Sequence, residues 1–167
     1  MRPPAALRGM EDPMTTNPPV VPVRPFRTVL LATDLTAASS EATERAVELS
    51  ARLGARLLIV HVMDSGRLVG GGSHERIDQA RAEREAVLLE VVRHARAAGA
   101  AAEFLIWTGD PGNSLVAAAE AEHADLLVVG TRGRSGAERM LLGSVSDHLV
   151  HHAGCPVLVV RPAKDAD

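Results

Sequence analysis

Five short runs of apolar residues alternate with longer stretches in which apolar and polar positions are mixed. The runs are TVLLAT (28–33), ARLLIVHV (55–62), EFLIW (103–107), DLLVV (125–129) and PVLVV (156–160). The first two and the last two consist almost entirely of Val, Leu and Ile, which is typical of strands covered on both faces. We therefore predict five strands of a parallel sheet.

The stretches between the runs show the periodicity of helices. Two of them, Ser39–Gly54 and His74–Gly99, end on a glycine, the residue that best adopts the left-handed conformation after a helix. Shorter helices are expected from about Asn113 to His123 and from about Ser144 to His152. The predicted inward-facing positions of the two long helices are Ala42, Ala46, Leu49 and Leu53, and Ile77, Ala80, Val87, Leu88, Val91 and Ala95. Strands alternating with helices in this way predict an α/β doubly wound sheet.

The two ends of the chain lack this pattern. Residues 1–25 hold seven of the ten prolines and show no periodicity, so we expect a disordered leader there, a folded domain over 26–162 and a tail over 163–167. Two glycine-rich segments, Val69–Gly72 and Gly109–Gly112, are predicted loops. The first is either a lid over a ligand or a plain connector.

Composition excludes several classes of function. The net charge is −3, with 23% charged residues of both signs, so no basic field is available to hold a nucleic-acid backbone. One Trp, two Phe and no Tyr give an aromatic surface too small for base stacking. The only lysine is Lys164 in the tail, which excludes a GxxxxGK[ST] phosphate loop and a protein-kinase site.

Cysteine usage and hydropathy favour the cytoplasm. Cys155 is the only cysteine, so an internal disulfide cannot form, and no segment has the pattern of a signal peptide or a membrane span. Cys155 introduces the last predicted strand and is interpreted as a small buried hydrophobe, not as a nucleophile.

The segment GTRGRSGAERMLLGS, Gly130–Ser144, lies between a predicted strand and a predicted helix. A strand, a glycine-rich loop and a helix N-terminus form an anion-binding arrangement, because bare backbone N–H groups and the helix dipole face the same point. The same residues also fit a strand end followed by turns, with Ser144 and Asp147 as a capping box. Spacing alone leaves both interpretations open.

A family resemblance bears on this choice. The pattern Gly130-x2-Gly133-x9-Gly143-Ser144, followed by VSDHLVHHAGCPVLVVRP, resembles the closing signature of the universal stress protein family. VLLATDLT (29–36), LLIVHVMD (57–64) and GDPGNSLVAAAEAEHADLLVVGTRG (109–133) also resemble segments of that family, so that the similarity spans 26–162. It implies a three-layer doubly wound fold of five parallel strands in the order 3-2-1-4-5, of the adenine nucleotide alpha-hydrolase-like (Rossmann-like) type.

The resemblance further implies the subgroup that binds ATP, with Mg²⁺. Asp34 would contact the nucleoside and Val62 the adenine. The strand order would bring Asp34 and Gly130 to face each other at the point where the chain switches direction, which is where open α/β sheets bind ligands. The full set of implied nucleotide contacts is Ala32, Thr33, Asp34, Val62, Gly130, Arg132, Gly133, Gly143, Ser144, Val145 and Ser146. A homodimer through the last strand, Pro156–Val160, is implied as well.

Asp34, Val62 and the histidines also have plain structural interpretations. Asp34 could cap the following helix, and Val62 could be an ordinary core residue. His61 is expected to be a hydrogen-bonded core histidine. His148, His151 and His152 have a spacing that can hold a metal, but histidines in the last turn of a helix are also favoured by its dipole, and we predict no metal site.

The resemblance therefore implies an ATP-binding regulatory protein of the stress response. One alternative is a slow ATPase or an autophosphorylating enzyme, since ATP would lie close to Ser144 and Ser146. No convincing general base accompanies these serines, which favours binding without efficient turnover. A second alternative is a nucleotide-free protein-interaction module.

Overall fold

The computed structural model describes residues 25–64, 74–131 and 142–162. Its strands all run parallel in the order β3-β2-β1-β4-β5, which confirms the predicted sheet. The strands are β1 (Thr28–Ala32), β2 (Arg56–Asp64), β3 (Ala101–Gly109), β4 (Leu126–Gly130) and β5 (Val157–Val160). The helices are a short 3-10 helix, η1 (Ala37–Ser39), followed by α1 (Ser40–Leu53), α3 (His74–Ala97), α4 (Pro111–Ala121) and α5 (Ser144–His152).

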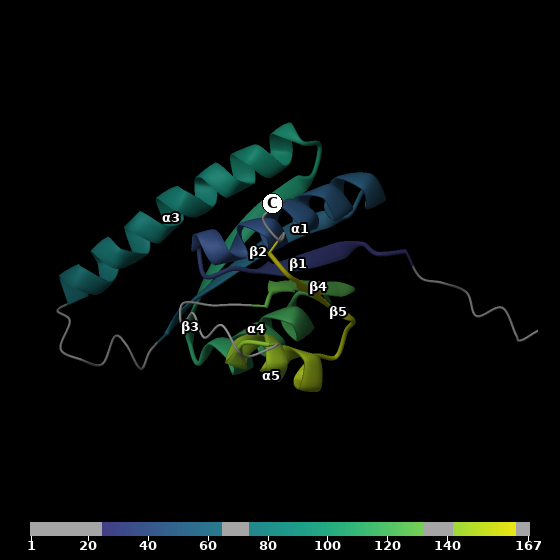
Figure 1. Cartoon of the computed structure of the whole chain (residues 1–167). Coiled ribbons are helices and arrows are strands. Elements are labelled where there is room, and N and C mark those ends of the chain that lie inside the picture. The colour runs from purple at the N-terminus through teal and green to yellow at the C-terminus, as the bar shows by residue number, and fades with distance from the viewer. Residues whose placement is uncertain (1–24, 65–73, 132–141, 163–167) are drawn as a thin grey trace, which may run out of the picture.

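Helices cover both faces of this sheet. Helices α1 and α3 lie on one side and α4 and α5 on the other (Figure 1). The chain moves outward from β1 through β2 to β3, and then returns to β4 on the other side of β1. Strands β1 and β4 are therefore neighbours whose following helices leave toward opposite faces, which makes their carboxyl ends the switch point of the sheet.

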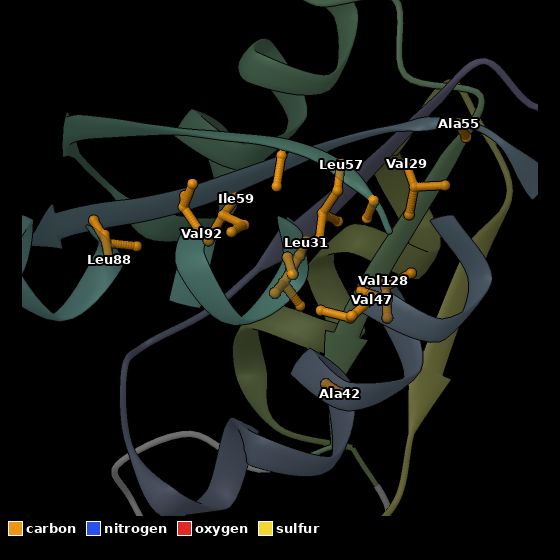
Figure 2. Packing of buried hydrophobic residues seen from close by; sticks show 14 residues of the cluster. Val29, Leu31, Ala42, Val47, Ala55, Leu57, Ile59, Leu88, Val92 and Val128 are labelled. Carbon is orange, nitrogen blue, oxygen red and sulfur yellow. The ribbon is translucent and has the colours of Figure 1, made fainter. Parts of the chain in front are cut away.

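The core consists of two apolar layers, one on each face of the sheet. Val29 and Leu31 of β1 pack with Leu57 and Ile59 of β2 beneath α1 and α3 (Figure 2). The alternate residues of the same strands, with Leu127 of β4, Leu115 of α4 and Leu149 of α5, form the second layer. Because successive strand residues point to opposite faces, burial on both sides requires the nearly continuous apolar runs that the sequence displays.

The helix ends agree with the sequence prediction, while two predicted inward positions are wrong. Gly54 and Gly99 have φ values of +63° and +91°, the left-handed conformation expected of them. Leu53 and Val87, however, are each 47% exposed. Leu53 is the last residue of α1, at the rim of the helical layer. Val87 is one residue, or about 100°, away from the buried Leu88 and lies on the flank of α3.

The predicted loop Gly109–Gly112 is shorter than expected. Asp110 is the N-cap of α4, and its Oδ1 accepts a hydrogen bond of 2.9 Å from the Asn113 N–H. Pro111 occupies the first helical turn, where its missing N–H costs nothing. Residues that suggested a loop are thus the start signal of a helix.

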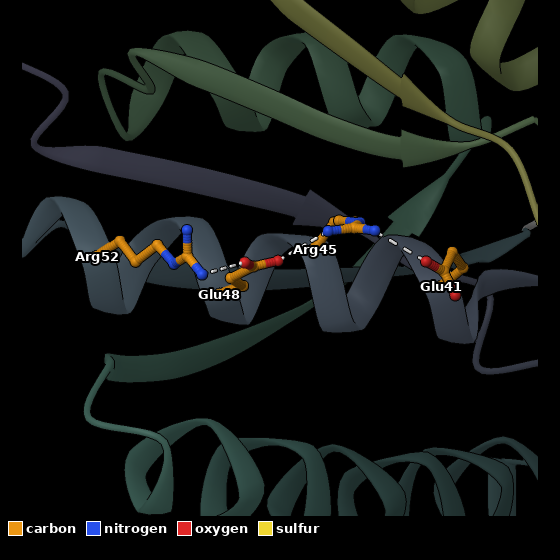
Figure 3. A network of polar contacts seen from close by, with 4 residues as sticks. All are labelled: Glu41, Arg45, Glu48 and Arg52. Carbon is orange, nitrogen blue, oxygen red and sulfur yellow. Dashed lines mark hydrogen bonds and ion pairs between the residues drawn. The ribbon is translucent and has the colours of Figure 1, made fainter. Parts of the chain in front are cut away.

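The outer face of α1 carries a row of alternating charges (Figure 3). Arg45 forms ion pairs with Glu41 at 3.6 Å and with Glu48 at 2.9 Å, and Arg52 pairs with Glu48 at 2.9 Å. These pairs are exposed, so each contributes only about 0.3–0.5 kcal/mol to the helix. They identify this face of α1 as solvated.

Candidate functional site

The carboxyl end of β1 leaves the sheet between two neighbouring strands. Ala32 is paired with Val60 of β2 and with Val129 of β4, and the N–H of Thr33 donates to the Val60 carbonyl at 3.1 Å. Asp34 follows directly and is only partly exposed. The three predicted contacts Ala32, Thr33 and Asp34 therefore lie at the switch point.

The two carboxylate oxygens of Asp34 differ in the hydrogen bonds that the described residues give them. Oδ1 accepts from the Thr36 N–H at 3.1 Å and from the Thr36 hydroxyl at 2.7 Å. Oδ2 is buried and has no hydrogen-bond donor among the described residues. A buried carboxylate oxygen without a donor is costly, so this atom is suited to accept a hydrogen bond from a bound molecule.

Asp34 does not cap a helix, and that alternative is wrong. The N-cap residues of η1 and α1 are Thr36 and Ser39, and neither helix start has a side-chain cap bond. Asp34 instead forms a local turn with Thr36, as Asp does when its side chain bonds to the backbone two residues on. Its carboxylate is thus oriented by the turn and does not cap a helix.

A buried hydroxyl network fixes this turn. The hydroxyl of Ser39 donates to the Thr36 carbonyl at 2.9 Å, so in its 3.0 Å contact with the Thr33 hydroxyl it is the acceptor. The Thr33 Oγ1 in turn accepts from the Leu35 N–H at 3.1 Å. Leu35 has φ +61°, a strained conformation for a non-glycine residue that persists only where neighbouring bonds enforce it. This network gave no signal in the sequence beyond the presence of hydroxyl residues.

The glycine-rich segment begins and ends at one place beside this turn. Gly130 is buried at the end of β4, the Thr131 N–H donates to the Val160 carbonyl at 2.9 Å, and the Gly143 N–H donates to the Thr131 carbonyl at 2.8 Å. Gly143 therefore lies next to the strand that Gly130 ends. Arg132 and Gly133, two of the predicted contacts, lie outside the described residues.

Helix α5 starts without a side-chain cap. Its N-cap is Gly143, which has no side chain. Ser144 is therefore the first helical residue, and the alternative interpretation of Ser144 with Asp147 as a capping box is wrong. Helix geometry leaves the first N–H groups, those of Ser144, Val145 and Ser146, without intrahelical acceptors. Ser146 is buried, and its hydroxyl donates to the Gly143 carbonyl at 2.9 Å. The start of α5 thus offers backbone donors and the positive end of the helix dipole.

The two predicted valines line the apolar side of this region. Val62 of β2 and Val145 of α5 are both half-buried and pack against the core layer beneath α4 and α5. Val62 is two residues beyond Val60, the partner of Ala32, and so is level with Asp34. The core interpretation of Val62 is therefore only partly correct, because one side of it is exposed at the carboxyl edge.

Histidines and the cysteine have structural surroundings. The rings of His148 and His152 stack with centroids 4.1 Å apart, and His148 covers Gly112 of α4. In the described part of the chain, no group of three or more His, Cys, Asp or Glu side chains could hold a metal ion. Burial raises the pKa of the Cys155 thiol, and the Asp125 carboxylate adds to the shift, so the thiol stays protonated. None of the described helices is both long and apolar enough to span a bilayer.

His61 is buried at 3% exposure, as predicted for a core histidine. Its Nδ1 lies 2.9 Å from the Thr33 carbonyl oxygen, which links β2 to the turn that carries Asp34. A polar residue in an otherwise apolar strand was the only sequence signal for this contact, and sequence reasoning did not connect it with the site.

Comparisons with known proteins all point to one family, and two of the similar solved structures contain a nucleotide. A model of the universal stress protein family matches residues 25–161. A universal stress protein of Methanocaldococcus jannaschii is 34% identical over 143 residues, which cover 83% of this chain and 84% of that protein. Among solved structures, a universal stress protein in complex with cAMP is 32% identical with a TM-score of 0.65, covering 83% of this chain and 98% of the other. A family member from Arabidopsis thaliana with AMP bound is 25% identical with a TM-score of 0.59, covering 83% and 94% respectively.

Proposed function

The chain belongs to the universal stress protein family, and from this premise we propose that it binds an adenine nucleotide at the switch point between β1 and β4. One observation carries the proposal: the buried Oδ2 of Asp34, which has no donor among the described residues, lies at the same edge of the sheet as the uncapped start of α5. An adenine nucleotide combines hydroxyl and amino donors with an anionic phosphate, so it matches both features. The cAMP and AMP complexes of the two similar proteins support this ligand class.

We assign the parts of the nucleotide by chemistry. Asp34 accepts hydrogen bonds from the nucleoside, because a carboxylate can only accept. Val62 and Val145 supply apolar contact for the base. The phosphates lie against the start of α5, where Gly143 permits close approach and the N–H groups of Ser144 to Ser146 donate. Arg132 and Gly133 complete the phosphate contacts in this proposal.

We propose ATP with Mg²⁺ as the physiological ligand and a regulatory role in the stress response, without efficient turnover. Ser146 already donates its hydroxyl proton to the Gly143 carbonyl, which gives that hydroxyl a structural role in the first turn of α5 and argues against it as a nucleophile. Phosphate release from Mg-ATP over several hours tests this part. Release that scales with protein and disappears in an Asp34 variant would replace it with the enzymatic alternative.

We further propose a cytoplasmic homodimer formed through β5. This strand is at the edge of the sheet, and its Leu158 is 37% exposed, so an apolar edge with open backbone groups is available for pairing. The dimer requires no residue of the nucleotide site.

The test of nucleotide binding is calorimetric titration of the wild type with Mg-ATP and, separately, with AMP. Asp34→Ala is the site variant, and Asp78→Ala on α3 is the matched control, since it removes the same charge at an exposed position outside the proposed contacts. We expect binding in the wild type and in the control, and weaker binding in Asp34→Ala. Equal affinity in all three proteins, or none in the wild type, contradicts the proposal, and the second result favours a nucleotide-free interaction module.

A further inference from the structure

The buried side chain of His61 contacts the backbone that carries Asp34. Thr33 is tied to β2 on both sides of its α-carbon, through its N–H to the Val60 carbonyl at 3.1 Å and through its carbonyl to the His61 ring at 2.9 Å. A carbonyl oxygen can only accept, so the His61 Nδ1 carries the proton and donates it. The donor comes from a residue 28 positions away in the chain.

This bond acts on the direction of the Asp34 carboxylate. The Thr33 carbonyl and the Asp34 N–H belong to one planar peptide group, so holding the oxygen fixes the plane from which Asp34 projects. The next residue, Leu35, has the strained φ of +61° and cannot supply that restraint by itself. On the far side, Thr36 holds Oδ1. The Thr33–Asp34 peptide is therefore held by His61 and the carboxylate by Thr36, while Oδ2 has no donor in the described part of the chain.

We propose that His61 is a positioning residue of the nucleotide site, which acts through the Thr33–Asp34 peptide and does not touch the ligand. The expected effect of His61 on affinity rests on the proposed function, because it presupposes nucleotide binding. The hydrogen-bonded arrangement itself is a property of the free protein and can be tested without any nucleotide.

A plain structural role predicts different results. If His61 only satisfied the core, its replacement would lower stability and leave both the affinity and the local order of the turn unchanged. Two substitutions separate the roles. His61→Leu keeps an apolar side chain of similar bulk but removes the donor. His61→Asn places an amide N–H at the same number of bonds from the backbone as Nδ1, so it can restore the bond to Thr33.

The affinity experiment uses AMP and Mg-ATP in calorimetric titrations of these variants. We expect His61→Leu to weaken binding about tenfold or more, whereas His61→Asn stays within about threefold of the wild type. Val92→Ala on α3 is the matched control, because Val92 is buried in the core layer beneath α1 and α3 and its truncation should lower stability without removing a hydrogen bond of the turn. In an Asp34→Ala background, His61→Leu should cause no further loss, since the effect passes through Asp34. An unchanged affinity in His61→Leu, or an equal loss in both backgrounds, overturns the inference.

Amide hydrogen exchange by NMR supplies the nucleotide-independent test. The Thr36 N–H is protected by its bond to Asp34 Oδ1, so it reports on whether Asp34 keeps its place. We expect its exchange to accelerate about tenfold in His61→Leu relative to His61→Asn, with no such local change in Val92→Ala. Unchanged exchange of the Thr36 N–H in His61→Leu overturns the inference, whether or not the wild type binds a nucleotide. Failure of the wild type to bind a nucleotide refutes only the proposed function.

Discussion

Replacing Asp34 with alanine should separate the stability of the free protein from its stabilisation by ligand. In the free protein the substitution removes two hydrogen bonds from Thr36, each with a net contribution of about 0.5–1.5 kcal/mol. It also removes the buried Oδ2, which has no donor among residues 25–64, 74–131 and 142–162, an unmet need that costs about 1–3 kcal/mol. The two effects oppose each other, so we expect the free energy of unfolding without ligand to change by less than about 1 kcal/mol.

The substitution should have a larger effect on the stability of the ligand-bound protein than on that of the free protein. A hydrogen bond to a charged acceptor contributes about 1.5–3 kcal/mol, and a loss of about 2 kcal/mol weakens binding about thirtyfold. At a nucleotide concentration of about 100 times the wild-type Kd, ligand stabilises the wild type by about 2.7 kcal/mol and the variant by about 0.9 kcal/mol. For a chain of this size we expect Tm increases of about 8 °C and about 3 °C.

Thermal unfolding followed by circular dichroism, with and without Mg-ATP or AMP, measures both quantities in one experiment. The Asp78→Ala control should show the full wild-type increase, because its side chain is exposed on α3. An Asp34→Ala protein that keeps the full ligand-induced increase in Tm would show that Asp34 does not contact the ligand. A variant that loses most of its stability without ligand would show that Oδ2 has a partner in the folded protein.

Three further predictions concern other parts of the fold. A Cβ at Gly112 would lie 2.8 Å from the His148 ring, so Gly112→Ala should lower the free energy of unfolding by about 1–3 kcal/mol, and His148→Ala should restore most of it in urea titrations. Because burial and the Asp125 charge raise the pKa of Cys155, its alkylation at pH 8 should be slower in the native protein than in the urea-unfolded protein; equal rates would show an exposed, unshifted thiol. Leu158→Glu at the exposed edge of β5 should convert the proposed dimer to monomers in sedimentation velocity without abolishing nucleotide binding, whereas an unchanged dimer would place the interface elsewhere.

The sheet and most helix ends could be predicted from the sequence. Burial of the strands on both faces requires continuous apolar runs, which are easy to recognise. Continuous Val, Leu and Ile runs located the strands within a few residues, and α5 begins at Ser144 and ends at His152, as expected. The strand order came from the family resemblance. Periodicity alone placed Leu53 and Val87 inside, because it gives the angle of a residue on its helix but not where the supporting sheet ends.

The site was harder to predict because its parts are held by contacts between distant segments. The segments carrying Asp34 and Gly143 could be named from motifs, yet the turn around Asp34 is bonded through the hydroxyls of Thr33 and Ser39 and the ring of His61. Buried side-chain hydrogen bonds leave no periodic trace in a sequence. The capping box was wrong for a related reason, because a serine at the first helical position and one at the N-cap look alike in a motif.

Binding of an adenine nucleotide at the carboxyl edge between β1 and β4 is the proposal on which the functional assignment depends. The most direct test is a titration of the isotope-labelled wild-type protein with AMP, followed by amide chemical shifts. We expect saturable shifts concentrated at Thr33–Asp34, Gly130–Thr131 and Gly143–Ser146, with little change at Arg56 and Asp125 on the opposite edge of the sheet. Absence of saturable shifts, or shifts concentrated on that opposite edge, would contradict the claim.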